Sequence, residues 1–264
     1  MSSSKSESAN TLSATSSTIV IERELQKVSL NNPIVICGFV GPGLAGLTAA
    51  GYIIEHLELH EVAHVRSRYI PPSVIFIGGR IRNPFRIYRD DSGKLAVVIC
   101  EVPVASSGLY DISSILLGWL KEFNPTEIVA LDGIPINNLQ ENRPTFYVAE
   151  ENRKSVLEGL GFLPAEATLI GGTAGSILSE CLARKIQCLA LLVPVSVALL
   201  DPGAPLALVR ALNSLYMLNI TTKELEEDVE MIHEELNEIA KTYQSLQDQA
   251  SAGKTENIPQ TMYR

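Results

Sequence analysis

Short apolar runs alternate with stretches of helical periodicity from Pro33 onward. Apolar runs of four to eight residues bounded by turn residues are typical of buried strands. An extended segment near residues 18–21 is predicted to open the fold. Further strands are predicted at 33–37, 62–65, 74–77, 85–88, 95–100, 128–131, 145–148, 168–170 and 188–193. Helices are predicted at 44–57, 106–123, 151–159, 173–185 and 204–218.

The order of these elements predicts an α/β domain over residues 18–220. Nearly continuous apolar strands separated by helices indicate a sheet that is covered on both faces, which gives a three-layer α/β/α arrangement. The turn sequence Asp90-Asp91-Ser92-Gly93 separates two of the strands and predicts a hairpin there. A hairpin requires antiparallel pairing, so the sheet is expected to be mixed.

The two ends of the chain differ from this domain in composition. Residues 1–17 contain eight serines, one leucine and no aromatic residue, and we expect this segment to be disordered. Residues 221–249 have the pattern of an acidic amphipathic helix, which begins with the capping-box sequence Thr221-Thr222-Lys223-Glu224. Residues 250–264 are expected to form a flexible tail, in which the twelve residues 250–261 span about 20 Å.

The apolar positions of the predicted acidic helix recur at spacings of four and three, as in a coiled coil. They are Leu225, Val229, Ile232, Leu236, Ile239, Tyr243 and Leu246. Two interpretations stay open. The helix packs on its own domain, or it forms an oligomer contact.

Composition and charge exclude several classes of partner. The chain has 264 residues, of which 46% are hydrophobic, and its net charge is -9, which disfavours general binding to nucleic acid or anionic membranes. The N-terminus shows no apolar signal core, and the longest apolar run, 188–200, is too short to span a bilayer. Cys37, Cys100, Cys181 and Cys188 all lie in apolar runs without a C-x-x-C pair, and we expect buried free thiols in a cytoplasmic protein.

The sequence Gly41-Pro42-Gly43-Leu44-Ala45-Gly46 follows a predicted strand and opens a helix. Its G-x-G-x-x-G pattern is that of a dinucleotide-binding turn. However, Pro42 removes an N–H group from that turn, and the next predicted strand ends in Arg66 rather than an acid. The alternative is that the glycines allow a tight turn and close packing of strand on helix. A second glycine turn, Gly171 to Ser176, also joins a predicted strand to a helix.

Other candidate sites are weaker. His56, His60 and His64 are spaced by four, but the predicted end of the helix near Leu59 would separate them, so no metal site is predicted. No G-x-S-x-G elbow is present, and no catalytic residues are predicted. Six arginines fall within 24 residues and either protect sheet edges or form a basic patch for an acidic partner. They are Arg66, Arg68, Arg80, Arg82, Arg86 and Arg89.

The chain ends in Met262-Tyr263-Arg264. A hydrophobic residue, a tyrosine and a final residue of any type resemble the HbYX pattern of proteasome-docking tails. A chain end offers an α-carboxylate that can pair with a lysine in a pocket. The tyrosine ring and the flexible methionine side chain suit an apolar groove. The tripeptide alone is short enough to arise by chance.

The body of the chain resembles the proteasome assembly chaperone family, in particular archaeal-type homologues of the second eukaryotic assembly chaperone. The segments that carry this resemblance are Pro33 to Gly43, Ala49 to Ile54 and Ile170 to Leu178, and the collinear match covers roughly residues 30–245. The resemblance implies a phosphorylase-like three-layer fold without catalysis or cofactor. It also implies homo-oligomers or heterodimers that bind the proteasome α-ring through the C-terminal tripeptide. One departure is Pro194-Val195, where an acidic residue is expected.

Three functional hypotheses follow. The first is an ATP-independent assembly chaperone or docking factor for the proteasome core particle, with Met262, Tyr263 and Arg264 as the partner-binding residues. The second is a nucleotide- or nucleoside-binding enzyme that uses the glycine turns at 41–46 and 171–176. The third is a scaffold assembled through the helix at 222–249.

Overall fold

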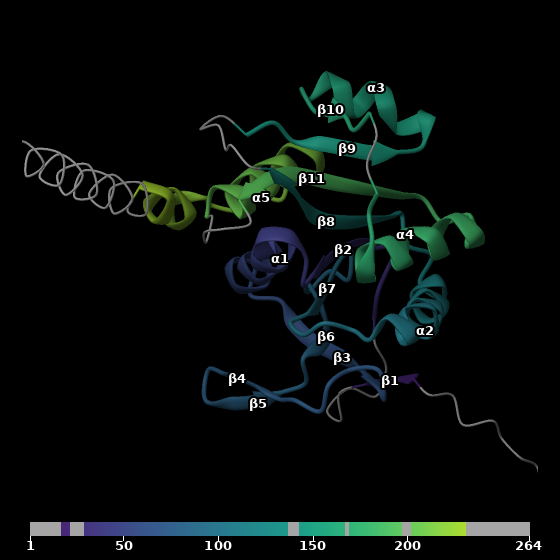
Figure 1. Ribbon diagram of the computed structural model, residues 1–264. Coiled ribbons are helices and arrows are strands. Elements are labelled where there is room, and N and C mark those ends of the chain that lie inside the picture. Colours follow the sequence, from purple (N-terminus) through teal and green to yellow (C-terminus); the bar gives the residue numbers. More distant parts are fainter. Residues whose placement is uncertain (1–16, 22–28, 137–142, 167–168, 197–201, 231–264) are drawn as a thin grey trace, which may run out of the picture. The chain divides into compact units, whose positions relative to one another are not determined.

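The computed structural model describes residues 17–21, 29–136, 143–166, 169–196 and 202–230. The chain divides into two units, Met1–Ile220 and Thr221–Arg264. The first unit holds a nine-stranded mixed sheet with helices on both faces, which confirms the predicted α/β/α class (Figure 1).

The strands of the large sheet lie in the order β1-β3-β6-β7-β2-β8-β11-β9-β10. Their bounds are β1 Ser17–Ile21, β2 Ile34–Phe39, β3 His60–Ser67, β6 Phe85–Arg89, β7 Leu95–Cys100, β8 Glu127–Ile136, β9 Phe146–Ala149, β10 Leu163–Pro164 and β11 Cys188–Ser196. Strands β7, β2, β8 and β11 are mutually parallel and form the centre of the sheet. The predicted hairpin is the antiparallel pair β6–β7. A separate ribbon pairs β4 (Ile75–Ile77) with β5 (Arg80–Arg82).

Helices cover both faces of the sheet. Their bounds are α1 Ala45–His56, α2 Leu109–Lys121, α3 Glu151–Gly159, α4 Gly172–Arg184 and α5 Gly203–Tyr216. Helices α1 and α5 pack together on one face, and α2 and α4 pack together on the other (Figure 1). Two 3-10 turns, η1 (Pro42–Leu44) and η2 (Ser106–Gly108), lead into α1 and α2. The central strands are therefore apolar along almost their whole length, since they are buried on both faces.

Most sequence predictions lie close to the observed elements, and one strand prediction is wrong. Residues 169–170 of the predicted strand 168–170 have no regular structure, and the Leu169 side chain is 94% exposed. Strand β1 begins at Ser17, one residue before the predicted start. The Ser17 hydroxyl lies 2.8 Å from Ser67 Oγ and 2.6 Å from Asp111 Oδ2, so it ties β1 to the start of α2. Residues 1–16 lie outside the described part.

In the second unit, residues 223–230 are helical, as predicted. The Thr222 hydroxyl, just before this helix, lies 2.5 Å from Glu226 Oε1. The remainder of the predicted acidic helix and the tail, 231–264, lie outside the described residues. Among the helices of the described segments, none has the length and apolar character that crossing a membrane requires.

Candidate functional site

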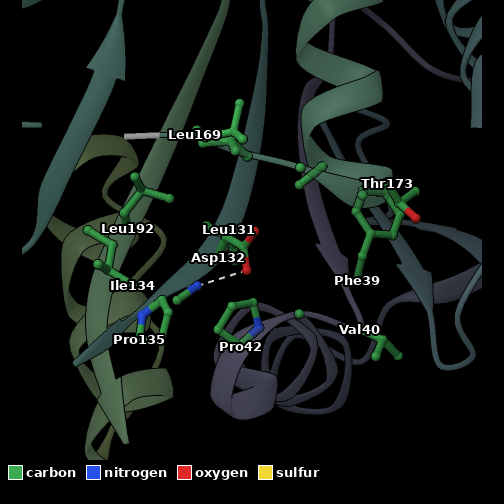
Figure 2. Close-up of a pocket in the computed structure, with 16 residues that line it drawn as sticks. Phe39, Val40, Pro42, Leu131, Asp132, Ile134, Pro135, Leu169, Thr173 and Leu192 are labelled. Atoms are coloured by element: carbon green, nitrogen blue, oxygen red, sulfur yellow. Dashed lines mark hydrogen bonds between the residues drawn. The ribbon is translucent and has the colours of Figure 1, made fainter. Parts of the chain in front are cut away.

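The two glycine turns border a single cavity of about 340 Å³ at the carboxyl ends of strands β2 and β8 (Figure 2). Ligands of open α/β sheets bind at this edge. The first turn supplies Gly41 and Pro42, and the second supplies Gly171 to Ala174. Most of the remaining lining is apolar and comes from the strand ends. These two turns are about 130 residues apart in the sequence, and the sheet brings them together.

In the first turn, each glycine has a separate packing reason. A Cβ added at Gly46 would lie 2.1 Å from the Leu131 carbonyl oxygen, so α1 can approach β8 only with glycine there. Gly43 has a φ of +61° and lies against Val195. A Cβ at Gly41 would lie 2.4 Å from Asp132 Oδ1. Thus the glycines provide the tight turn and close packing weighed above as the alternative to dinucleotide binding.

Asp132 is the only charged side chain among the described residues that line the cavity. Its Oδ1 accepts a 2.8 Å hydrogen bond from the backbone N–H of Gly133. Burial raises the pKa of the Asp132 carboxyl above its usual value, and the Gly133 hydrogen bond opposes that shift only in part. Figure 2 shows this carboxylate near the middle of the view, between Pro42 and Leu169. Sequence reasoning missed Asp132, although a carboxylate directly after a buried strand was a visible signal.

The second turn leads into α4. Gly172 has a φ of +60°, which favours glycine, and no side chain caps the helix at Gly171. The backbone N–H groups of Gly172, Thr173 and Ala174 belong to the first turn of the helix, where N–H groups have no partner within the helix. The cavity therefore combines the positive end of a helix with one carboxylate.

These charges disfavour a phosphate in the first glycine turn. The Asp132 carboxylate lies directly against Gly41, so a phosphate bound there would meet a like charge. An arginine after the second strand can accommodate the 2′-phosphate of a dinucleotide, but Arg66 lies on β3, which pairs with β1 and β6 rather than with β2. The family resemblance predicts an acidic residue at Pro194-Val195. Strand β11 instead continues through these two residues to Ser196 and carries no acid there. The acid of the cavity comes instead from the neighbouring strand β8.

The three histidines do not gather into one site. His56 ends α1, and its Nδ1 lies 3.0 Å from the Tyr52 carbonyl oxygen. His60 lies on β3, with Nε2 3.1 Å from Asp91 Oδ1. His64 lies further along the same strand. No group of three or more potential metal ligands occurs within the described segments.

Half of the predicted arginine cluster is engaged inside the domain. Arg86 is 2% exposed and forms an ion pair with Glu101 at 2.6 Å, and Arg82 forms one with Glu61 at 2.7 Å. Arg89 Nη1 donates a hydrogen bond of 2.6 Å to the Asp90 carbonyl oxygen. The two hypotheses for the cluster, edge protection and a basic patch, therefore apply only to the exposed Arg66, Arg68 and Arg80.

All four cysteines are buried free thiols, as predicted. Burial raises the pKa of Cys37 to about 12 and that of Cys100 to about 11. Thiols with such values are almost fully protonated at neutral pH and are poor nucleophiles. The predicted docking residues Met262, Tyr263 and Arg264 lie outside the described residues.

A model of the PAC2 family matches residues 35–240, which is more than half of the chain. The chain belongs to the PAC2 family. This PAC2 match confirms the resemblance found in the sequence. A Thermoplasma acidophilum protein of unknown function is 43% identical, with a TM-score of 0.71 over 84% of this chain and 91% of its own.

Other PAC2-like relatives are more distant. Pyrococcus furiosus PbaA, an archaeal homologue of proteasome-assembly chaperone, is 24% identical, with a TM-score of 0.77 over 90% of this chain and 97% of its own. PbaB of the same organism, an archaeal proteasome activator, is 23% identical, with a TM-score of 0.74 over 86% of this chain and 99% of its own. An uncharacterized Methanocaldococcus jannaschii protein is 24% identical over 222 residues, 83% of this chain and 90% of its own. At these identities the two Pyrococcus structures support the shared fold.

Proposed function

We propose that this PAC2-family chain is an ATP-independent assembly chaperone or docking factor for the proteasome core particle. The observation that carries the proposal is the combination of the family match with the final tripeptide Met262-Tyr263-Arg264. The relatives PbaA and PbaB, described as a chaperone homologue and a proteasome activator, support a proteasome partner. The proposed role needs no catalytic residue and no cofactor.

The proposed contact is made by the chain end with the α-ring. The terminal carboxylate pairs with a lysine in a cleft of the ring, the Tyr263 ring packs in the same cleft, and Met262 fills the adjoining apolar groove. Residues 250–261 are small and polar in the main and provide about 20 Å of tether. Such a length lets the tail enter a cleft that the folded domain cannot reach.

One tail binds weakly, and an oligomer strengthens the contact. If several copies assemble, their identical tails reach neighbouring clefts, and avidity raises the overall affinity by about 100-fold or more. The heptad pattern between Leu225 and Leu246 is the proposed oligomer contact.

The test is co-purification of the full chain with purified core particle. Deletion of Met262-Tyr263-Arg264, or Tyr263→Ala, is expected to abolish co-purification, whereas Gln260→Ala in the same tail is expected to preserve it. Circular dichroism should be unchanged in every variant, because the edits lie outside the α/β domain. Equal recovery of core particle with the intact and the truncated tail would rule out the proposed mechanism.

A further inference from the structure

The cavity at the ends of β2 and β8 has no part in the proposed tail contact. Its volume of about 340 Å³ lies within the range of small-molecule sites. Its described lining is apolar apart from two side chains, the Asp132 carboxylate and the Thr173 hydroxyl. A largely apolar cavity with a single charged group is the composition expected of a site that orients one small ligand.

The Asp132 carboxylate has spare capacity for a ligand. One of its oxygens, Oδ1, accepts the Gly133 N–H, and no described residue donates a hydrogen bond to Oδ2. A partly buried carboxylate without a cation costs stability, and carboxyl groups perturbed in this way cluster at functional sites. Here the burial is sufficient to raise the pKa of this carboxyl.

The backbone packs closely beside the carboxylate. Gly41 leaves room for Oδ1, since a Cβ there would lie 2.4 Å away. Gly133 allows the Pro42 carbonyl oxygen to come close, since a Cβ at Gly133 would lie 2.4 Å from that oxygen. Two segments some 90 residues apart therefore pack closely beside the carboxylate, and this close packing forms one wall of the cavity.

We propose that this cavity binds a small organic cation, an amine, amidine or guanidine on an apolar body, with the charge paired to Asp132. The positive end of α4 carries only about half a unit charge and offsets the carboxylate in part. Phosphates and carboxylic acids are disfavoured by the same carboxylate. At about 30 Å³ per water, the cavity equals roughly eleven waters, which suits a ligand of about ten non-hydrogen atoms.

The experiment compares benzamidine with benzamide, which have nearly the same shape and differ in charge. Thermal unfolding and calorimetric titration of the full chain should show binding of benzamidine and much weaker binding of benzamide. A charge-assisted hydrogen bond accounts for a difference of about 10- to 100-fold in Kd. This comparison uses only the wild-type protein, so it does not depend on the folding of a variant.

The variants locate the site. Asp132→Asn keeps the shape of the side chain and is expected to weaken benzamidine binding by the same factor, whereas Asp91→Asn, at an exposed turn residue, is expected to leave it unchanged. Equal affinity for benzamidine and benzamide, no binding of either, or unchanged binding by Asp132→Asn would each overturn the proposal. None of these results affects co-purification with the core particle, so this proposal and the proposed function fail separately.

Discussion

Glu127 joins three elements at the start of β8. Arg153 of α3 donates two hydrogen bonds of 2.9 Å, one to each carboxylate oxygen, and the Tyr216 hydroxyl of α5 donates to Oε2. The Glu127 residue is 4% exposed. Burial, and then the charge of Glu127, raise the pKa of Tyr216, so its hydroxyl stays a donor. We predict that Glu127→Gln weakens the whole domain, because the amide leaves Arg153 without its counter-charge.

The magnitude follows from burial. Removing one partner of a fully buried ion pair costs about 3–5 kcal/mol. The Arg153 side chain is 22% exposed, and water can solvate part of its released charge, which places the loss at the lower end, about 3 kcal/mol. At roughly 2–4 °C per kcal/mol for a domain of this size, Tm should fall by about 6–12 °C.

The assay is urea unfolding followed by circular dichroism, with the free energy compared at an unchanged m value. The matched control is Glu227→Gln. It removes an ion pair with Lys223 in which the two side chains are 63% and 79% exposed, and it should cost less than about 0.5 kcal/mol. A loss below about 1 kcal/mol for Glu127→Gln would refute the reasoning about the buried network.

Three further predictions concern the candidate site and the predicted acidic helix at 221–249. Gly46→Ala should cost about 1–3 kcal/mol in urea unfolding because its Cβ meets the Leu131 carbonyl oxygen, whereas Gly51→Ala in the same helix, with its nearest atom at 3.9 Å, should be neutral or stabilising. Burial raises the pKa of Asp132, so its ionisation opposes folding. Asp132→Asn should therefore raise stability at pH 7, a gain that shrinks as the pH falls through the raised pKa; a stability loss at pH 7 would contradict this. Ile232→Lys with Leu236→Lys should lower the mass measured by light scattering if the helix forms the oligomer contact, and an unchanged mass would exclude it.

The apolar pattern predicted most strands and helices because the central strands are buried on both faces. It failed where apolar character did not mean burial. Leu169 lies in the predicted strand at 168–170, but its side chain is 94% exposed, and residues 169–170 form no strand. Strand β10 is two residues long and has no periodicity to detect.

Strands β8 and β11 are longer than predicted because each contains a proline at a position where only one of its two neighbouring strands is still paired with it. Strand β9 pairs with β11 only as far as Leu192, so Pro194 needs no N–H group on that side. Strand β2 pairs with β8 only as far as Leu131, which leaves the same freedom to Pro135. Whether a strand can continue through a proline therefore depends on where its neighbouring strands stop pairing with it, and the sequence of one strand does not show that pairing.

The candidate site was predictable in part. The two glycine turns were visible as strand-to-helix junctions, but their meeting at one cavity depends on the strand order. The part of Asp132 in this cavity could be inferred only from the fold, which places its carboxylate against Gly41. The arginine cluster was predicted less well. Its member Arg86 was assigned to a sheet edge or a surface patch, but it is buried beside Glu101.

The central claim is that a free chain end binds the core particle. The most direct measurement is the affinity of immobilised core particle for the full chain, compared with the same chain extended by three residues, Gly-Ser-Gly, after Arg264. The extension keeps every native side chain and only displaces the carboxylate from Tyr263. We predict that binding of the extended chain falls below detection, whereas equal affinity of the two chains would contradict the account.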